Sequence, residues 1–420
     1  MLEWLRLENV GPAPKFELDF APRVNLITGD NGLGKSFLLD VAWWALTGFW
    51  SNEITPNANV TTGQPSIEWR GSSIAFGSPE QPLISANAGV FDFALQEWHG
   101  KNESAFYRPL DFIIVQSKVD GAFSIYDSHR TIPFNHAAFV FNAGSVWNGL
   151  EQNGKIVCNG LVRDWATWQL ENGEAFKQLK AALKVLSPDE HEILEPGKLT
   201  RVSLNDVRDI PTLRMPYGQE VPIIHASAGI KRVSSLAYLM VWAWQEHLRA
   251  AKLIKRRPTR EMVILIDELE EHLHPRWQRV ILPALLAVAK TIMSGSDVRV
   301  QIIAATHSPM VMASLEPLFD AEQDAWFDLN LVDGEVTLEK MAWRKHGDAN
   351  AWLESEAFDL PSTGSIPAGI TKESAAKALE NPRLSKKKFL EHDTALRGVL
   401  SDTDEFWIRW RFVGEKKGWL

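Results

Sequence analysis

Residues 1–50 alternate between apolar and polar positions in a way that predicts three short strands and a helix. Residues 2–8 and 16–20 place apolar side chains at roughly every second position, which is typical of strands with one buried face. Residues 24–28 form a short apolar run that leads into a glycine-rich segment. Residues 37–50 then place apolar side chains at helical spacing, so a strand, a glycine-rich loop and a helix are expected to follow one another.

The later part of the chain predicts a second alternation of helices and buried strands. Residues 225–253 have the pattern of one long helix after a short loop. Residues 262–266 and 298–305 are continuous apolar runs, which favour buried parallel strands, and residues 275–292 are predicted to be helical. The order of these elements indicates an α/β fold.

Residues 51–222 show no regular period, because glycine, proline and tryptophan interrupt every apolar run. Within this span we predict strands over 66–76 and 110–116, a helix over 174–186 and the start of another helix at 187–190. No heptad pattern is sustained, which argues against a long coiled coil.

We therefore expect an α/β core in two halves, with an inserted β-rich and helical lobe between them and a C-terminal region that packs on the core or docks a partner. The bounds of the four parts are 1–50, 51–222, 223–345 and 346–420. The aromatic residues near the C-terminus suit core packing, the more common role, or docking: Phe406, Trp407, Trp410 and Trp419.

Composition narrows the class of protein without naming a function. The 420 residues include 44 Lys and Arg against 53 Asp and Glu, and the formal net charge of −9 excludes a generally basic nucleic-acid coat. The single cysteine, Cys158, excludes an intrachain disulfide framework and a cysteine-cluster zinc site. No apolar run approaches the ~20 residues of a membrane helix, and no signal-peptide pattern opens the chain, so we expect a cytoplasmic protein without membrane contact.

The glycine-rich segment fits the phosphate-loop pattern G-x-x-x-x-G-K-[ST] from Gly29 to Ser36, and it lies between a predicted strand and a predicted helix. In such a loop the backbone N–H groups surround a phosphate, Lys35 supplies a positive charge to the phosphate oxygens, and the Ser36 hydroxyl is a ligand for Mg²⁺. A turn with an incidental lysine is the alternative, and the flanking elements make it much the weaker one.

Three further segments supply chemistry around a phosphate. The apolar strand 262–266 ends in Asp267, a candidate Mg²⁺ ligand, and Glu268, a candidate base for water. His307 follows the next buried strand and could reach a γ-phosphate, although a histidine that only caps a helix is the commoner case. Ser227 and Gly229 form a small-residue turn before a helix, which is a second phosphate-binding device. Two such devices for one γ-phosphate suggest a site shared between two chains.

Four segments in this order resemble ABC-type ATPases of the SMC, RecF and OLD class: GDNGLGKS at 29–36, SAGIKR at 227–232, ILIDELEEHLHP at 264–275 and ATHSP at 305–309. The resemblance covers residues 1–50 and about 220–345. The second segment departs from the usual Leu-Ser-Gly-Gly-Gln signature and is similar to the form in compact AAA-type ATPases of bacterial phage-defence systems such as Septu.

The resemblance implies a P-loop NTPase fold of ABC type, ATP and Mg²⁺ as ligands, and a head-to-head homodimer, or a higher even-numbered oligomer, with composite sites. It also places Gln116 at the family's Q-loop. The implied nucleotide-contacting residues are Asn31, Gly32, Gly34, Lys35, Ser36, Phe37, Gln116, Ser227 and Gly229. The implied metal-contacting residues are Ser36, Gln116 and Asp267, and the implied catalytic residues are Lys35, Glu268 and His307.

Some residue assignments stay open at this stage. His272 and His274 lie in a segment that resembles the family's D-loop, and an H-x-H metal pair is the less favoured alternative. Lys15 and Phe16 are weak candidates for contact with an adenine ring.

Three functions remain in view. The first is an ATP-driven dimer that controls a separate effector, for which the resemblance suggests an HNH-like nuclease. The second is a RecF-like DNA repair or recombination ATPase that clamps DNA, and the third is a scaffold in which ATP is only structural. Glu268 and His307 argue against the third, because a purely structural site needs neither residue.

Basic segments are the sequence features relevant to nucleic acid, and solvated surface is the commoner role for such runs. One group comprises Lys252, Lys255, Arg256, Arg257 and Arg260, and the other comprises Arg383, Lys386, Lys387 and Lys388. DNA contact therefore stays possible. Only 113 residues follow His307, without a Toprim-like acidic pattern, so a nuclease within the same chain is not expected.

Overall fold

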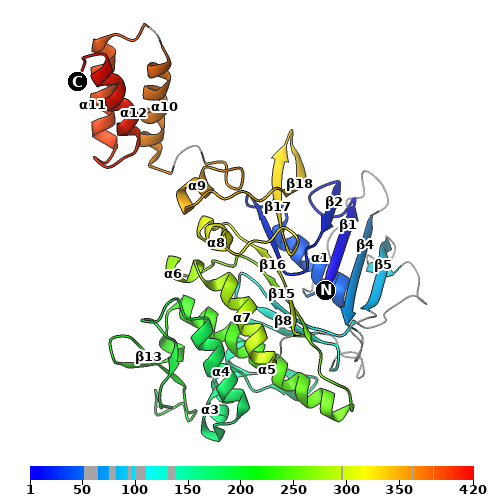
Figure 1. The fold of residues 1–420 in the computed structure, drawn as a ribbon. Coiled ribbons are helices and arrows are strands. Elements are labelled where there is room, and N and C mark those ends of the chain that lie inside the picture. The colour runs from blue at the N-terminus through cyan, green and yellow to red at the C-terminus, as the bar shows by residue number, and fades with distance from the viewer. Residues whose placement is uncertain are drawn as a thin grey trace. The chain divides into compact units, whose positions relative to one another are not determined.

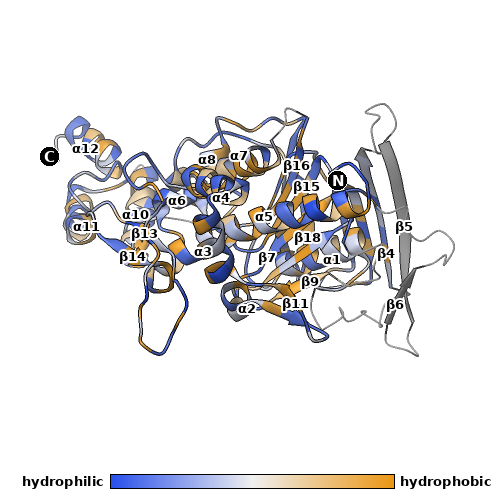
Figure 2. Cartoon of the chain, turned by 90° about the horizontal axis from the view of Figure 1, so that it is seen from below, coloured by the Kyte–Doolittle hydropathy of each residue, from blue (hydrophilic) through white to orange (hydrophobic). Residues whose placement is uncertain are grey.

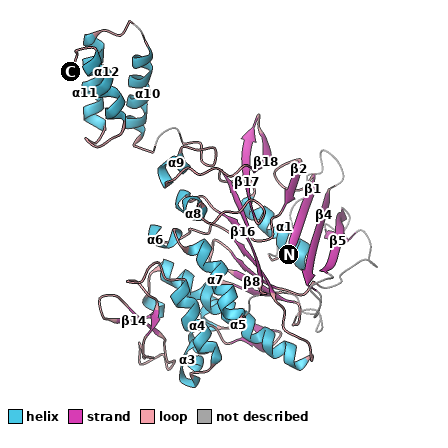
Figure 3. Cartoon of the chain, viewed as in Figure 1, coloured by secondary structure: helices cyan, strands magenta, loops and turns pink. Residues whose placement is uncertain are grey.

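The computed structural model describes residues 1–51, 65–74, 82–92, 97–100, 110–130, 138–294, 297–360, 363–381 and 383–420. The chain divides into two compact units, Met1–Lys345 and His346–Leu420. Figures 1 and 3 show strands and helices of the first unit and helices of the second.

A mixed sheet forms the centre of the first unit, and within the described residues it has eight strands in the order β18-β17-β3-β16-β15-β7-β8-β9. Their bounds are Glu335–Met341, Asp324–Val332, Val24–Gly29, Arg299–Ala305, Glu261–Ile266, Ile113–Ser117, Phe123–Asp127 and Phe139–Phe141. The five strands from β17 to β7 are mutually parallel. At the two edges β18 and β8 run antiparallel to them, and β9 pairs antiparallel with β8. The strands predicted over 24–28, 262–266 and 298–305 are thus neighbours, and their carboxyl ends meet at one edge of the sheet.

A second, antiparallel sheet has the strand order β2-β1-β4-β5-β6 in the described part of the chain. Its strands are Lys15–Asp19, Leu2–Glu8, Ser66–Ile74, Pro82–Asp92 and Glu97–Gly100. The strands predicted over 2–8, 16–20 and 66–76 belong here, apart from residues 75–76, which lie outside the described residues.

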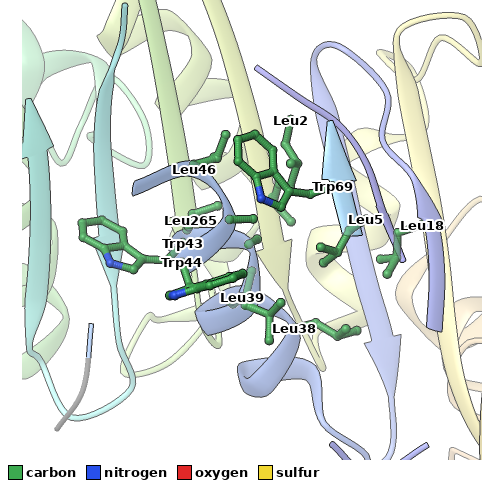
Figure 4. Packing of buried hydrophobic residues seen from close by; sticks show 14 of the residues in the cluster. Leu2, Leu5, Leu18, Leu38, Leu39, Trp43, Trp44, Leu46, Trp69 and Leu265 are labelled. Carbon is green, nitrogen blue, oxygen red and sulfur yellow. The ribbon is translucent and has the colours of Figure 1, made fainter. Parts of the chain in front are cut away.

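Helix α1, Lys35–Thr47, packs between the two sheets. Figure 4 shows side chains of α1, among them Leu38, Leu39 and Trp43, together with Leu5 of the antiparallel sheet and Leu265 of β15. All five side chains are buried. This shared core fixes the start of α1, and with it the glycine-rich loop, against the central sheet.

The remaining helices of the first unit include α5, Ala228–Leu253, which contacts β7, α4 and α7. The other helices are α2 (Ala143–Asn148), α3 (Leu161–Glu171), α4 (Glu174–Val185), α6 (Pro275–Gln278), α7 (Ile281–Met293) and α8 (Pro309–Leu315), and a 3₁₀ turn, Ile223–His225, precedes α5. Two small sheets complete the unit: β10 and β11, Leu150–Gln152 and Lys155–Cys158, and then β12, β13 and β14, Glu195–Pro196, Thr212–Arg214 and Glu220–Pro222. Strands β7 to β9 come from the span expected as an inserted lobe, yet they extend the central sheet.

Two predicted helices differ from the structure. Residues 187–190 do not start a helix: the Ser187 hydroxyl donates to Leu183 O at 2.8 Å, and the Asp189 carboxylate accepts from His191 N at 2.8 Å, so both side chains form a turn. The helix predicted over 275–292 is split into α6 and α7. Pro283 has no N–H to continue the first helix, and its position suits the first turn of a new one.

The second unit contains α9 (Ala349–Leu353), α10 (Ile366–Glu380), α11 (Lys386–Val399) and α12 (Phe406–Lys416). Figure 2 shows hydrophobic and hydrophilic residues alternating around α11 and α12, as expected for helices with one buried face. Trp407 and Trp410 are buried with Phe389 and Leu396, and Phe406 and Trp419 pack against this cluster. Core packing, the role favoured from the sequence, is confirmed for these aromatic residues, so Trp407 and Trp410 do not offer a surface to a partner.

No helix in the part of the chain that the structure describes is both long enough and apolar enough to span a bilayer.

Candidate functional site

The loop between β3 and α1 has the backbone of a phosphate-binding loop. Gly29, Gly32 and Gly34 have φ values of 125°, 82° and 105°, which other residues adopt only with strain. A Cβ atom on Gly29 would lie 2.3 Å from Leu329 O, and one on Gly34 would lie 2.6 Å from Pro12 Cγ. Two of the three glycines are therefore required both by φ and by their close neighbours. The helix that follows has no side-chain cap, so its first N–H groups stay available to an anion.

Lys35 is buried at the start of α1, and its Nζ donates to the carbonyl oxygens of Gly29 and Asp30, each at 2.7 Å. Burial lowers the pKa of Lys35, and Asp267 opposes this shift more than any other carboxylate. The ammonium group thus lies across the loop, where a phosphate oxygen could replace the two carbonyl contacts.

The Ser36 and Asp267 side chains, predicted to share a metal ion, lie together. A side-chain hydrogen bond from Ser36 reaches the Asp267 carboxylate and lowers its pKa, although burial, the largest influence, raises that pKa overall. Gln116 lies on β7, paired in parallel with β15, and its Nε2 donates to Asp40 Oδ1 at 2.9 Å. Asp40 is on α1, one helical turn after Ser36, and also pairs with Lys118 at 3.3 Å.

This cluster suits a magnesium ion held partly by a nucleotide. Asp267 Oδ1 and Gln116 Oε1 are both buried without a hydrogen-bond partner. Carboxylate, amide and hydroxyl oxygens are the ligand types that Mg²⁺ prefers, and phosphates and water usually complete its shell. Among the described residues, no group of three or more His, Cys, Asp or Glu could hold a metal by itself, which gives the His272 and His274 pair no support as a metal site.

Glu268 lies in a turn with left-handed backbone geometry, at a φ of 45°. Arg232, in the first turns of α5, donates to Asp267 O at 3.0 Å and Glu268 O at 2.9 Å, and it pairs with the Glu271 carboxylate. The turn that presents Glu268 is therefore attached to the helix that begins with Ser227 and Ala228.

His307 follows β16 and lies near the same charges. Burial, and then the positive charge of Lys35, lower the pKa of His307, while Glu270, Glu268 and Asp267 oppose the shift. The imidazole is therefore held in its neutral form more strongly than usual, and a neutral imidazole can both donate and accept a hydrogen bond.

Ser227 and Gly229 lie in a different pocket of about 700 Å³. Its lining comprises Glu192, Ser227, Ala228, Gly229, His272, Leu273, His274, Arg276 and Trp277, and no residue of the phosphate loop. Ser227 is exposed and accepts from Ile230 N at 3.4 Å, whereas Gly229 is buried and a Cβ there would lie 2.6 Å from His272 O. Within one chain, this pocket and the phosphate loop are thus separate.

The candidates for adenine contact, and Phe37 beside them, already have partners within the chain. Phe16 is fully buried, and its ring centroid lies 6.4 Å from that of Phe37, while Lys15 pairs with Glu17 at 3.0 Å. A buried ring cannot stack on an adenine base, so the suggestion for Phe16 is wrong for this conformation. The Phe37 ring packs closely against the backbone at Gly11, because a Cβ atom added to Gly11 would lie 2.4 Å from the ring.

Sequence reasoning missed three residues of this site: Asp40, Arg232 and Glu270. Asp40 follows Ser36 by four residues, a spacing that places both on one helix face, and this signal could have been used. Arg232 and Glu270 lie within the family-like segments 227–232 and 264–275. Only their partners in the folded chain distinguish them from surface charges.

Two AAA-domain family models match this chain. One, described as "AAA domain, putative AbiEii toxin, Type IV TA system", matches residues 119–313, and the other, described as "AAA domain", matches residues 5–108.

The curated relatives that match include Septu and retron proteins. Septu protein PtuA of Bacillus thuringiensis is 24% identical over 328 residues, which are 75% of this chain and 74% of that protein. Retron Ec83 probable ATPase of Escherichia coli is 41% identical over 98 residues, 23% of this chain and 15% of that protein. Retron Vc95 probable ATPase of Vibrio cholerae is 26% identical over 140 residues, 30% of this chain and 24% of that protein.

Solved structures that match this chain include an SMC head domain from Thermotoga maritima and the recombination mediator protein RecF. The SMC head has a TM-score of 0.38 and 15% identity, over 81% of this chain and 99% of that chain. RecF has a TM-score of 0.39 and 15% identity, over 81% and 98% of the two chains. No functional conclusion follows from likenesses at this level.

Proposed function

We propose that this chain, an ABC-type AAA ATPase that resembles those of bacterial phage-defence systems, binds and hydrolyses ATP in a dimer and thereby controls a separate effector. The supporting observation is the convergence of Ser36, Asp267 and Gln116 beside the phosphate loop, with two buried oxygens that lack partners. A Gly-rich turn without a ligand has no need to bury such oxygens, because each costs desolvation free energy.

The residues have distinct roles in this proposal. The N–H groups of Asn31, Gly32, Gly34, Ser36 and Phe37 bind phosphate oxygens, and Lys35 exchanges its carbonyl partners for the β- and γ-phosphates. Ser36, Asp267 and Gln116 hold Mg²⁺, which neutralises charge on the phosphates when bound. The Glu268 carboxylate accepts a proton from the attacking water, and the neutral imidazole of His307 orients that water or the γ-phosphate.

The second phosphate device completes the site from another copy of the chain. Ser227 is exposed at the N-terminus of α5, a 26-residue helix, and its pocket is separate from the phosphate loop of the same chain. In the proposed homodimer, Ser227 and the α5 N-terminus of one copy approach the γ-phosphate held by Lys35 of the other. Nucleotide binding then brings two copies together, and hydrolysis releases them.

The effector is proposed from resemblance to the Septu and retron proteins, and an HNH-like nuclease is our first candidate. Co-purification of the native operon, with mass measurement of what accompanies the tagged chain, tests this part. Recovery of the ATPase alone, with and without ATP, would contradict a stable effector complex.

Phosphate release from Mg²⁺-ATP tests the enzymatic part. We expect Lys35→Ala to lose nucleotide binding and Glu268→Gln to bind ATP while losing turnover by about 100-fold, a typical contribution of a positioned base. Lys184→Ala and Glu322→Gln, which change exposed residues of the same types, are the matched controls and should match the wild type. Equal turnover of Glu268→Gln and wild type would favour a structural nucleotide instead.

Mixing two inactive variants tests the shared site. Lys35→Ala and Ser227→Arg should each be inactive alone, whereas their heterodimer contains one intact site and should recover part of the turnover. If no mixing ratio restores activity, although both variants are folded, the composite site is wrong.

A DNA-clamping ATPase is the second candidate, favoured by the exposed basic residues in the last turn of α5 and after it. Lys252, Lys255, Arg256, Arg257 and Arg260 are all exposed, and the left-handed backbone of Lys255 ends the helix in a fixed turn. Binding to duplex DNA that weakens steeply with salt, and is strengthened by ATP, would favour this candidate.

A further inference from the structure

Glu270 connects two loops of the site, and the proposed function gives it no role. Its Oε2 accepts from the Thr306 hydroxyl at 2.6 Å, and its Oε1 accepts from the His307 backbone N–H at 2.6 Å. Both carboxylate oxygens are thus directed at the two residues that follow β16. Short hydrogen bonds to an ionised carboxylate are about twice as strong as neutral ones.

The backbone around these residues is already attached to neighbouring strands. Thr306 N donates to Ile27 O at 3.1 Å, and Leu269 N donates to Ala305 O at 3.1 Å. Ser308 N donates to the Thr306 hydroxyl oxygen at 3.1 Å. The peptide N–H of His307 has Glu270 as its acceptor, so this carboxylate determines how the His307 peptide is oriented.

We propose that Glu270 is a positioning residue that orients the His307 peptide from the turn that also presents Glu268. Glu270 lies two residues after Glu268 and acts on the reaction only through Thr306 and His307. The inference rests on the proposed function, because the proposed function places His307 beside the γ-phosphate. The negative charge of Glu270 also raises the pKa of His307, against burial and Lys35.

Geometry and charge can be separated by substitution. In Glu270→Gln the amide oxygen can accept from His307 N–H while the NH₂ group donates to the Thr306 hydroxyl oxygen, so the arrangement survives without the charge. In Glu270→Ala both bonds are lost. Thr306→Val removes one bond and leaves Glu270 in place, and Thr306→Ser restores the hydroxyl.

Steady-state turnover gives the first test. We expect Glu270→Ala to lower kcat by about tenfold or more with KM within about twofold, and Glu270→Gln to stay within about threefold of the wild type. Because Glu270 acts through His307, the Glu270→Ala/His307→Ala double variant should be no slower than His307→Ala alone. Wild-type kcat in Glu270→Ala, or losses that multiply in the double variant, would overturn the inference.

The hydrogen bond itself gives a test that needs no turnover. In full-length protein labelled with ¹⁵N-histidine, one of 11 histidine amide signals is His307, identified by its absence in His307→Ala. We expect this proton to resonate downfield and to move upfield by about 1 ppm or more in Glu270→Ala, but less in Glu270→Gln. An unchanged shift in Glu270→Ala would overturn the inference.

The two tests distinguish failure of the inference from failure of the proposed function. If the wild type releases no phosphate, the proposed function fails, while the amide shift still reports the contact. If Glu270→Ala does not fold, Glu270→Gln and the Thr306 pair provide the comparison: Thr306→Val should lower kcat and Thr306→Ser should not. Equal kcat for the two Thr306 variants would then overturn the inference.

Discussion

At the scale of single residues, the site is a collection of charges in poorly solvated positions. Lys35 and Asp267 are buried. Burial lowers the pKa of Lys35 and raises the pKa of Asp267, which favours the neutral form of each side chain. The Ser36 hydrogen bond and Lys35 favour the charged carboxylate of Asp267, whereas Glu268 and Asp40 oppose it. Burial of these charges costs free energy, which the proposed cation and nucleotide would offset.

Removal of one of these charges should therefore stabilise the nucleotide-free protein. We expect Asp267→Asn to raise Tm without ligand by a few degrees, as for a gain of about 1 kcal/mol, and to remove the Mg²⁺-dependent increase in Tm with ATP. Thermal melts with and without Mg²⁺-ATP measure both effects. A lower Tm of the free variant would show that the carboxylate is already well compensated.

His307 predicts the direction of a pH effect. Its pKa is lowered below the usual value of 6.5, so the neutral imidazole persists to a lower pH than in a free histidine. Turnover should therefore stay level as pH falls to about 6.5 and decline only below it. As pH falls, the His307 imidazole is protonated in the unfolded chain before it is protonated in the folded chain. The contribution of neutral His307 to stability is therefore fully present above about pH 6.5 and is lost as pH falls below this value. A decline in kcat that begins well above 6.5, and is absent in His307→Ala, would contradict the assignment.

At the scale of elements, α5 connects the Ser227 pocket with the turn that presents Glu268. Its first residues form the Ser227 pocket, and Arg232, one turn later, holds the carbonyl oxygens of Asp267 and Glu268. Gly229 allows α5 to approach the His272 carbonyl. Movement at Ser227 can thus reach Glu268 through a rigid helix.

A methyl group at Gly229 should disturb this contact. A Cβ would lie 2.6 Å from the backbone oxygen of His272, so the helix start or the turn must shift in Gly229→Ala. We expect a loss of about 1–3 kcal/mol in unfolding free energy, measured by denaturant titration, and reduced turnover. Gly173→Ala is the control, since no atom lies within 4 Å of its Cβ. Equal stability of both variants would show that the contact yields easily.

The predicted elements agree best with the structure where the alternation of apolar and polar residues within the segment marks one buried face. β1, β2, β3, β15, β16, α1, α4 and α5 lie within a few residues of their predictions. The failures involve side-chain bonds and proline: Ser187 and Asp189 form turn bonds instead of capping a helix, and Pro283 divides α6 from α7. Strands β17 and β18 and the second-unit helices were not predicted. The Asp333-Gly334 turn between the two strands is a local hairpin signal that could have been used.

At the scale of the whole molecule, the two units have separate cores. The cluster of the second unit comprises Ala375, Leu384, Phe389, Leu396, Trp407 and Trp410, all from that unit. Trp410 is fully buried, its ring stacks on Phe389 at 4.3 Å, and its Nε1 donates to Asp393 at 3.1 Å.

Loss of Trp410 should therefore affect the second unit alone. We expect Trp410→Ala in the full chain to cost about 3–5 kcal/mol within that unit, enough to unfold it, while ATP binding by the first unit persists. Proteolysis followed by mass measurement should find cleavage within residues 346–420 only, and Phe412→Ala, at an exposed site, is the control. Loss of ATP binding in Trp410→Ala would show that the first unit depends on the second.

The sequence by itself determined the candidate site of this protein, because a phosphate loop, an acidic strand end and the flanking periodicity are local patterns that depend only on neighbouring residues. Those patterns predicted Lys35, Ser36, Asp267, Glu268 and His307 as one site. The tertiary structure decided which groups support that site, since the roles of Asp40, Arg232 and Glu270 depend on partners more than 30 residues away along the chain. A charge on the surface and a charge that orients a loop look alike in sequence, and only the packing of the parallel strands makes them different.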